Sequence, residues 1–244
     1  MRRVQFAVLG PMTIVAEGRP IRLETPKLRV LLASLLVRAN KTTSFSYLGR
    51  RLWVDQPPCN PRPAIHTYVT RLRRIIGGNQ IHTCPGGYLI EVGPDQLDLL
   101  HFEQLVREAD TSTELCQRAK LLRSATNLWR DEPFADIDSS VLHNEDVTPL
   151  VERCLLTEER RIDADLELGR HAELVPDLRV LVARYPLREK LWTQLATALF
   201  RSGRRADALA TYREVDHILA TEVGINPGPE LRDLHQAMLT NDAL

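Results

Sequence analysis

The first 93 residues begin and end with strand-like patterns of apolar side chains. Short apolar runs rich in β-branched residues fill positions 4–23 and are interrupted at Gly10–Pro11 and at Glu17–Gly18. This pattern predicts a small antiparallel sheet with tight turns. Two further extended arms, within residues 81–92, flank Pro85–Gly86–Gly87, and this arrangement indicates a β-hairpin.

Between these strands the apolar residues follow the 3.6-residue spacing of helices. We predict three helices there, at residues 25–40, 44–53 and 60–76. Thr25 and Ser44 are the expected N-caps of the first two helices, and a proline-broken loop separates the second helix from the third. The order of sheet, three helices and hairpin is that of a helix-turn-helix followed by a β-hairpin wing.

The third predicted helix combines an apolar face with a polar face that contains no acidic residue. Six side chains form the polar face: His66, Thr67, Thr70, Arg71, Arg73 and Arg74. An ordinary solvated basic face is one interpretation, but such faces usually mix charges to gain i,i+4 pairs. Short hydroxyl side chains beside arginines suit a helix that enters the DNA major groove, where arginine reaches guanine edges or phosphates.

Basic residues outside this polar face are also placed to contact phosphate. Arg50 and Arg51 lie on the second predicted helix, and Arg62 lies in the first turn of the third. Lys27 stands at the start of the first helix, where free backbone amides also favour an anion. The narrow tip of the hairpin, with sequence TCPGG, fits a neighbouring minor groove.

The charge is unevenly distributed along the chain. Lys plus Arg equals Asp plus Glu at 32 each, which taken alone argues against a nucleic-acid-binding protein. Residues 1–93, however, hold 14 basic and 4 acidic side chains, and residues 94–244 carry a net charge of −10. We therefore predict a basic module drawn to a polyanion, joined to an acidic module that does not compete for it.

The chain beyond residue 93 is predicted to be helical nearly throughout. Interruptions fall at residues 130–140 and 222–230. The pattern Gly-Arg-x-Ala-acid occurs twice, starting at Gly169 and at Gly203, and the two glycines are 34 residues apart. This period is that of tetratricopeptide helix pairs. We therefore expect two domains, at residues 1–93 and 94–244.

Several separated motifs resemble one family. The stretches PKLRVLLASLLVRAN, PAIHTYVTRLRRIIG and TCPGGYLIEV resemble the OmpR/PhoB-type winged helix, a two-component-like output domain, as found in the Streptomyces antibiotic regulatory protein family. The stretches LDLLHFEQLV, LWRDEPFADI and EVGINPGPELRDLHQAML resemble that family's bacterial transcriptional activator domain. The expected fold is an α+β winged helix-turn-helix followed by an all-α, tetratricopeptide-like helical-repeat domain.

The resemblance implies a transcriptional activator of a secondary-metabolite (antibiotic) gene cluster. Such a protein binds direct repeats in double-stranded DNA near the −35 region as a homodimer, and it recruits RNA polymerase, including its sigma factor. By position, the resemblance places Thr67, Arg71 and Arg73 in the groove. Three further residues, Thr83, Gly86 and Gly87, correspond to positions on the wing. A loop that contacts the polymerase in this family corresponds here to Asp55, Gln56, Pro57 and Pro58.

Other function classes find little support in the sequence. No Gly-rich phosphate loop, GxSxG or HExxH motif occurs, so we expect neither an enzyme nor a cofactor. His143 with Glu145–Asp146 could bind a metal, but a polar loop is the favoured interpretation, and no metal site is predicted. A helical-repeat scaffold for protein interaction, with an accessory nucleic-acid-binding module, is the alternative. It leaves the basic segment unexplained.

The sequence also bears on the compartment. The four cysteines show no CxxC spacing, so we predict free thiols. No stretch approaches the ~18 apolar residues of a membrane span. The apolar run after the first arginines is too short for a signal peptide. We expect a cytoplasmic protein without a membrane partner.

Overall fold

The computed structural model describes residues 4–53 and 58–240. The chain divides into two compact units: residues 1–111 together with 123–156, and residues 112–122 together with 157–244. The first unit therefore contains the predicted winged-helix domain and part of the segment that follows it. The division into domains at residues 93 and 94 stays a prediction.

The first unit opens with the predicted antiparallel sheet. It consists of β1 (Val4–Ala7), β2 (Thr13–Ala16) and β3 (Arg19–Ile21), in that order. Phe6 pairs with Ile14, and Ile14 pairs with Ile21. Residues directly opposite in antiparallel strands share a face, and the buried side chains of Phe6 and Ile14 make this face part of the core.

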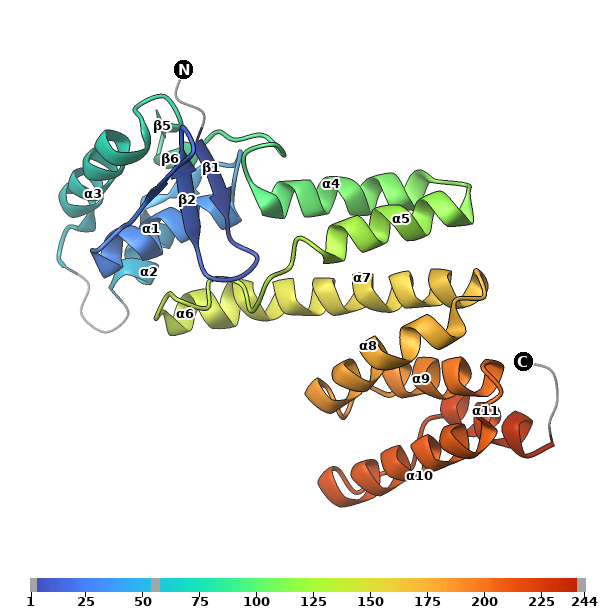
Figure 1. Ribbon diagram of the computed structural model, residues 1–244. Helices are drawn as coiled ribbons and strands as arrows, with labels where there is room; N and C mark the ends of the chain where they lie inside the picture. The colour runs from blue at the N-terminus through green and yellow to red at the C-terminus, as the bar shows by residue number, and fades with distance from the viewer. Residues whose placement is uncertain (1–3, 54–57, 241–244) are drawn as a thin grey trace. The chain divides into compact units, whose positions relative to one another are not determined.

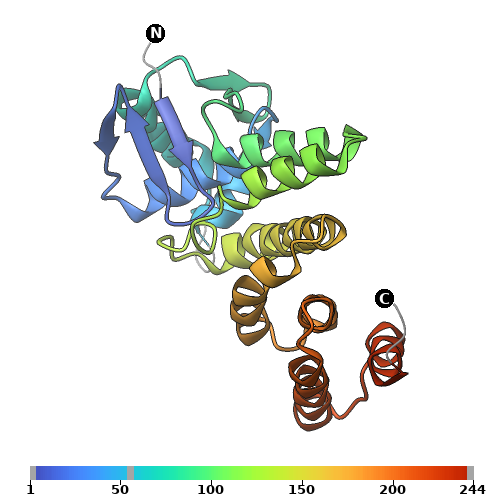
Figure 2. The ribbon, with the colours of Figure 1, turned by 45° about the vertical axis from the view of Figure 1, so that its right-hand side comes forward.

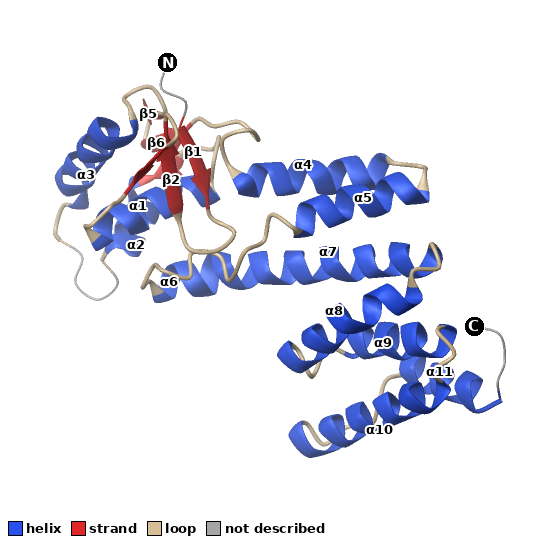
Figure 3. Ribbon diagram, viewed as in Figure 1, coloured by secondary structure: helices blue, strands red, loops and turns tan. Residues whose placement is uncertain are grey.

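Three helices follow the sheet: α1 (Pro26–Val37), α2 (Phe45–Leu52) and α3 (Pro61–Ile76). They form a group beside the strands (Figures 1 and 3). The side chain of Ser44 accepts a hydrogen bond from Tyr47 N at 3.2 Å, and that of Asn60 accepts one from Arg62 N at 3.2 Å. These caps confirm the predicted start of α2 and fix that of α3. Thr25 is the N-cap residue of α1, as predicted, but its side chain makes no capping hydrogen bond.

The predicted hairpin is present and carries a third strand. β5 (Ile81–Cys84) and β6 (Gly87–Ile90) pair antiparallel, and β6 also pairs with the two-residue β4 (Thr43–Ser44). Gly86 has φ +84°, a conformation that favours glycine. A Cβ atom on Gly87 would lie 2.0 Å from the carbonyl oxygen of Thr43. The wing is therefore held against the segment that leads into α2.

The remainder of the first unit is largely helical and shares the core of the winged helix. It comprises α4 (Asp98–Thr111), the end of α5 (Leu115–Thr126), α6 (Ser140–Leu142), the π-helical turn η1 (His143–Val147) and the start of α7 (Thr148–Glu167). Residues 130–139 lie outside helices, as predicted. Buried side chains of this region belong to the same hydrophobic cluster as those of α1 and α3: Phe102, Ala125, Phe134, Leu142, Val147 and Leu150.

The second unit is an all-α helical repeat. Its later helices are α8 (His171–Arg184), α9 (Glu189–Arg201), α10 (Arg205–Glu222) and α11 (Pro229–Thr240), which follow one another in orange to red in Figure 2. Gly169 and Gly203 occupy equivalent turns, between α7 and α8 and between α9 and α10, with φ +79° and +77°. This equivalence confirms the predicted 34-residue repeat, and Trp192 on α9 is buried in the core of the unit.

Candidate nucleic-acid interface

Helix α3 separates its apolar and polar residues as the sequence predicts. Its buried side chains are Ile65, Val69, Leu72 and Ile76. Its exposed polar side chains include His66, Thr67, Arg71 and Arg74, while Thr70 is half-buried. The face predicted to meet DNA is therefore largely open to solvent.

The exposed arginines of α3 have no carboxylate partner in the described part of the chain. Within residues 4–53 and 58–240, neither Arg71 nor Arg74 forms an ion pair. Elsewhere in the same unit, Arg29 pairs with Asp136, and Arg130 Nη2 lies 3.6 Å from Asp98 Oδ2. An unpaired guanidinium keeps all its donors available for phosphate or guanine.

The threonines of this face use their hydroxyl protons within the helix. Thr67 Oγ1 donates to Pro63 O at 3.0 Å, and Thr70 Oγ1 donates to His66 O at 2.9 Å. Each hydroxyl oxygen keeps acceptor capacity. Both side chains therefore suit a base-edge donor or a thymine methyl group better than a phosphate.

Arg73 makes contacts within the protein that the sequence does not predict. Its Nε and Nη2 atoms donate to Ile81 O at 2.9 and 2.7 Å, and Nη2 also donates to Thr83 Oγ1 at 2.9 Å. Arg73 is half-buried. In this structure the guanidinium fastens α3 to β5, and the predicted position of Arg73 in the groove stays a prediction. Thr83 stays exposed on the wing, with its hydroxyl oxygen engaged by Arg73.

Tyr88 joins the wing to α3 and was missed by the sequence analysis. Its ring is 1% exposed, and its hydroxyl lies 3.0 Å from His66 Nδ1. Its ring centroid lies 5.5 Å from that of Phe45 in an edge-on arrangement, and the Arg73 guanidinium lies 5.8 Å from it. Burial raises the pKa of Tyr88, although Arg73 acts in the opposite direction. The phenol is therefore a neutral hydrogen-bonding group.

Arg51 is not available to DNA. Its side chain is 1% exposed, its guanidinium lies 4.2 Å from the Tyr47 ring centroid, and it pairs with Asp146 and, at 3.1 Å, with Glu145. The predicted phosphate contact of Arg51 is wrong because carboxylates of η1 neutralise it. Arg50 also approaches Glu145, at 3.2 Å, but its side chain is 60% exposed. Its phosphate contact stays a prediction.

The acidic segment is not electrostatically separate from the basic one. Residues 94–111 and 123–156, which belong to the first unit, hold 12 acidic and 4 basic side chains. Carboxylates from this region neutralise Arg29, Arg50 and Arg51. Some arginines of the basic module are therefore occupied by carboxylates of the acidic one, while the expectation that the acidic module does not compete for the polyanion stays a prediction. Among the described residues, the four arginines of α3 form no ion pair: Arg62, Arg71, Arg73 and Arg74.

The other predicted contacts differ in how accessible they are. Lys27 is half-buried, with its ammonium 4.8 Å from the ring centroid of Trp53. Arg62 is exposed and lies 5.2 Å from the ring centroid of Phe45. Gly86 is exposed at the wing tip, but Gly87 is buried against β4, so Gly87 supports the wing rather than touching DNA. Pro58 is exposed. Three predicted polymerase contacts lie outside the described residues: Asp55, Gln56 and Pro57.

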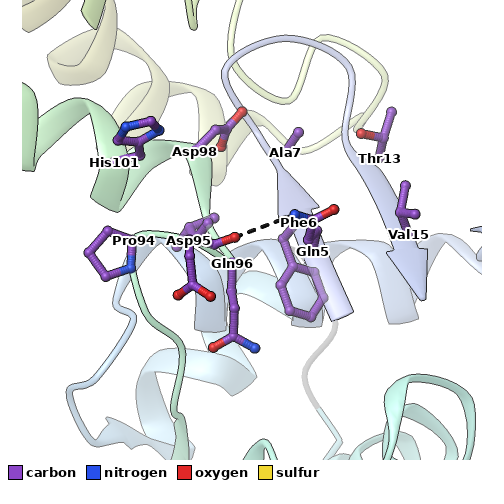
Figure 4. Close-up of a pocket in the computed structure, with 11 residues that line it drawn as sticks. Gln5, Phe6, Ala7, Thr13, Val15, Pro94, Asp95, Gln96, Asp98 and His101 are labelled. Atoms are coloured by element: carbon purple, nitrogen blue, oxygen red, sulfur yellow. Dashed lines mark hydrogen bonds between the residues drawn. The ribbon is translucent and has the colours of Figure 1, made fainter. Parts of the chain in front are cut away.

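A small pocket of about 270 Å³ lies beside β1 (Figure 4). Phe6 N donates to Gln96 O at 2.7 Å there, which closes the free edge of β1. Asp98, at the start of α4, accepts bonds from Val8 N and Leu9 N at 2.8 and 3.0 Å. The polar groups around this pocket are used to join α4 to the sheet, so the pocket serves the fold.

The structure also bears on metals, thiols and membranes. In the described part of the chain, no group of three or more His, Cys, Asp or Glu side chains could hold a metal ion. The three side chains weighed as metal ligands, His143, Glu145 and Asp146, have separate partners. His143 contacts Glu132, while Glu145 and Asp146 pair with arginines. The four cysteines are free thiols, as predicted. None of the described helices is long and apolar enough to cross a membrane.

Comparisons with known proteins point to one family. Residues 97–239 match the bacterial transcriptional activator domain. The chain is 37% identical to the regulatory protein AfsR of Streptomyces griseus, over 98% of this chain but 25% of that protein. It is 32% identical to the regulatory protein DnrI of Streptomyces peucetius, over 98% of this chain and 93% of that protein.

A solved structure shows the same fold. Mycobacterium tuberculosis EmbR, in complex with a low-affinity phosphopeptide, superposes with a TM-score of 0.93 at 32% identity, covering 100% of this chain and 67% of that one. An α+β winged helix followed by a tetratricopeptide-like helical domain is thus confirmed as the fold class.

Proposed function

This chain belongs to the Streptomyces antibiotic regulatory protein family of transcriptional regulators with a bacterial transcriptional activator domain, and we propose that it activates a biosynthetic gene cluster by binding direct DNA repeats. It binds near the −35 region as a homodimer and recruits RNA polymerase. The chain spans 25% of the length of AfsR.

The unpaired arginines of α3 carry this proposal. In a unit rich in carboxylates, Arg71 and Arg74 are exposed and form no ion pair with any residue that the structure describes. Counterions released from phosphates would supply sequence-independent affinity, and contacts from α3 to base edges would supply preference. Fastening α3 to the wing through Arg73 lets the two elements approach DNA as one rigid surface.

Two protomers on adjacent repeats explain how a small interface gains affinity. A single winged helix offers few base contacts. A second protomer bound to the neighbouring repeat converts the next binding event into an effectively intramolecular one. The alternative of a protein-interaction scaffold gains no support, since the relatives are named as regulators.

The test compares duplexes that carry two repeats, one repeat or a scrambled sequence, taken from upstream regions near the gene. We expect tighter binding to two repeats than to one, and the weakest binding to the scrambled duplex. In a transcription reaction with purified polymerase, the two-repeat promoter should yield more transcript when the protein is present. Equal affinity for all three duplexes would refute sequence-specific binding, and unchanged transcript would refute activation.

A further inference from the structure

We propose that Tyr88 holds His66 in the tautomer that carries its proton on Nε2, so that His66 donates a hydrogen bond to a purine acceptor in the major groove. Guanine fits best, because it presents two acceptors, N7 and O6. The inference rests on the proposed DNA binding by α3 and adds a specificity-determining pair to it.

The first observation is the geometry of the pair. His66 Nδ1 lies 3.0 Å from the hydroxyl oxygen of Tyr88. The two nitrogens of an imidazole ring direct their hydrogen bonds away from each other, so Nε2 faces away from Tyr88. His66 is exposed, and its Nε2 has no hydrogen-bond partner within residues 4–53 and 58–240. This nitrogen is therefore open to a ligand.

The burial of the Tyr88 hydroxyl decides the direction of its hydrogen bond with His66. Tyr88 is 1% exposed, and His66 is the only hydrogen-bond partner of its hydroxyl among the described residues. If His66 carried its proton on Nδ1, the buried O–H of Tyr88 would have no acceptor. Buried donors left unpaired are costly. Tyr88 therefore donates to Nδ1, and the proton of the neutral imidazole resides on Nε2.

The third observation is that Tyr88 itself is held in place from several sides. Phe45 packs edge-on against its ring at 5.5 Å between centroids. In the sheet, Tyr88 pairs with Thr43 on one side and with Thr83 on the other. Arg73 ties β5 to α3 beside it. The orientation of His66 is thus set by the wing and not by α3 alone.

The chemistry follows from the groove edges of the bases. Guanine N7 and O6, adenine N7 and thymine O4 accept hydrogen bonds there, whereas cytosine N4 and adenine N6 donate. A fixed Nε2–H donor favours an acceptor and disfavours a donor. A ring free to change tautomer could meet either kind of base. Tyr88 is therefore a positioning residue: by fixing the tautomer of His66, it makes the contact of His66 selective for hydrogen-bond acceptors on the base edges.

The binding test uses Tyr88→Phe, which removes only the hydroxyl, together with His66→Ala and the double variant. Each is titrated against the preferred two-repeat duplex and a panel with single base-pair changes under α3. We expect Tyr88→Phe to reduce discrimination at one base pair by about three- to tenfold, and to have no further effect in the His66→Ala background. Tyr68→Phe removes the hydroxyl of a half-buried tyrosine on α3; it is the control and should leave discrimination unchanged.

A spectroscopic measurement on the wild-type protein makes the test independent of variant folding. Ring ¹⁵N chemical shifts at about pH 8, where histidine is ordinarily neutral, distinguish the two tautomers. We expect the Nε2–H form in the wild type and a mixture in Tyr88→Phe. Observation of the Nδ1–H form in the wild type would overturn the proposal.

The binding outcomes separate this inference from the proposed function. If the wild type shows no sequence preference, the proposed function fails. If the wild type is selective but Tyr88→Phe keeps full discrimination, or loses affinity equally for every duplex, only the pairing of Tyr88 with His66 fails. His66→Gln offers a second variant: its amide both donates and accepts, so it should bind while discriminating less at the same base pair.

Discussion

Asp98, at the start of α4, is a single residue that joins this helix to the first sheet. Its carboxylate accepts hydrogen bonds from Val8 N and Leu9 N, and Arg130 lies 3.6 Å away. Burial nevertheless raises the pKa of Asp98, because desolvation outweighs these favourable contacts. The folded chain therefore binds this proton more tightly than the unfolded chain does.

The difference in the pKa of Asp98 between the folded and the unfolded chain predicts that stability depends on pH. For a carboxyl whose pKa is raised by folding, the contribution to stability is greatest at acid pH and falls as pH rises above about 3.9, the value for unfolded aspartate. Asp98→Asn lacks this titration. Urea unfolding from about pH 4 to pH 7 should show wild type losing stability relative to Asp98→Asn. A relative gain over the same interval would contradict the account.

Whether a side chain's partners are near in sequence or far away also decides which candidate site residues could be predicted from the sequence. The acid-free face of α3 follows from local spacing, so the exposed positions of His66, Thr67 and Arg71 could be predicted. The roles of Arg51 and Arg73 depend on groups brought close only by folding. Arg51 meets Asp146, 95 positions away, and Arg73 meets a carbonyl of β5. A side chain's charge is visible in a sequence, but its partner is not.

At the scale of elements, local chemistry predicted most helices and strands. Ser44 and Asn60 cap α2 and α3 through neighbours two or three residues away, and Gly169 and Gly203 mark repeat turns by their own backbone conformation. Two elements escaped prediction. β4 has only two residues and exists because β6 pairs with it. The π-helical η1 lies where its carboxylates meet Arg50 and Arg51.

The wing offers a direct test of one such non-local contact. Gly87→Ala would place a methyl group 2.0 Å from Thr43 O, so β6 must move away from β4. Gly86→Ala is the matched control, since nothing lies within 4 Å of its added Cβ and only the backbone conformation is strained, at about 1–2 kcal/mol. Thermal unfolding should show the larger loss for Gly87→Ala, and equal losses would argue against a close β4–β6 approach.

The contact between α2 and η1 should contribute substantially to the stability of the first unit. Burial raises the pKa of Asp146 although Arg51 beside it lowers it. Removing one partner of a buried ion pair typically costs about 3–5 kcal/mol, so Asp146→Ala should be strongly destabilising in urea unfolding. Asp138→Ala, at an exposed aspartate of the same segment, should change stability by less than about 0.5 kcal/mol. Similar losses for both variants would contradict this role.

For the molecule as a whole, the boundaries of the compact units do not coincide with the division of the sequence into a basic and an acidic part. The sequence suggests a basic half and an acidic half, but the most acidic region, within residues 94–156, belongs largely to the same compact unit as the basic module. Its carboxylates neutralise several arginines, whereas the arginines of α3 form no ion pair within residues 4–53 and 58–240. Under the proposed function, this neutralisation leaves the exposed arginines of α3 available for DNA.

Fluorescence anisotropy of wild type, Arg71→Ala and Arg107→Ala on two-repeat and scrambled duplexes tests this central claim most directly. Arg107 is an exposed arginine on α4 and serves as the control. Arg71→Ala should weaken binding to the repeats by about 5- to 150-fold and binding to the scrambled duplex much less, while Arg107→Ala changes neither. An unchanged ratio of the two affinities in Arg71→Ala would show that the exposed face of α3 does not distinguish DNA sequences.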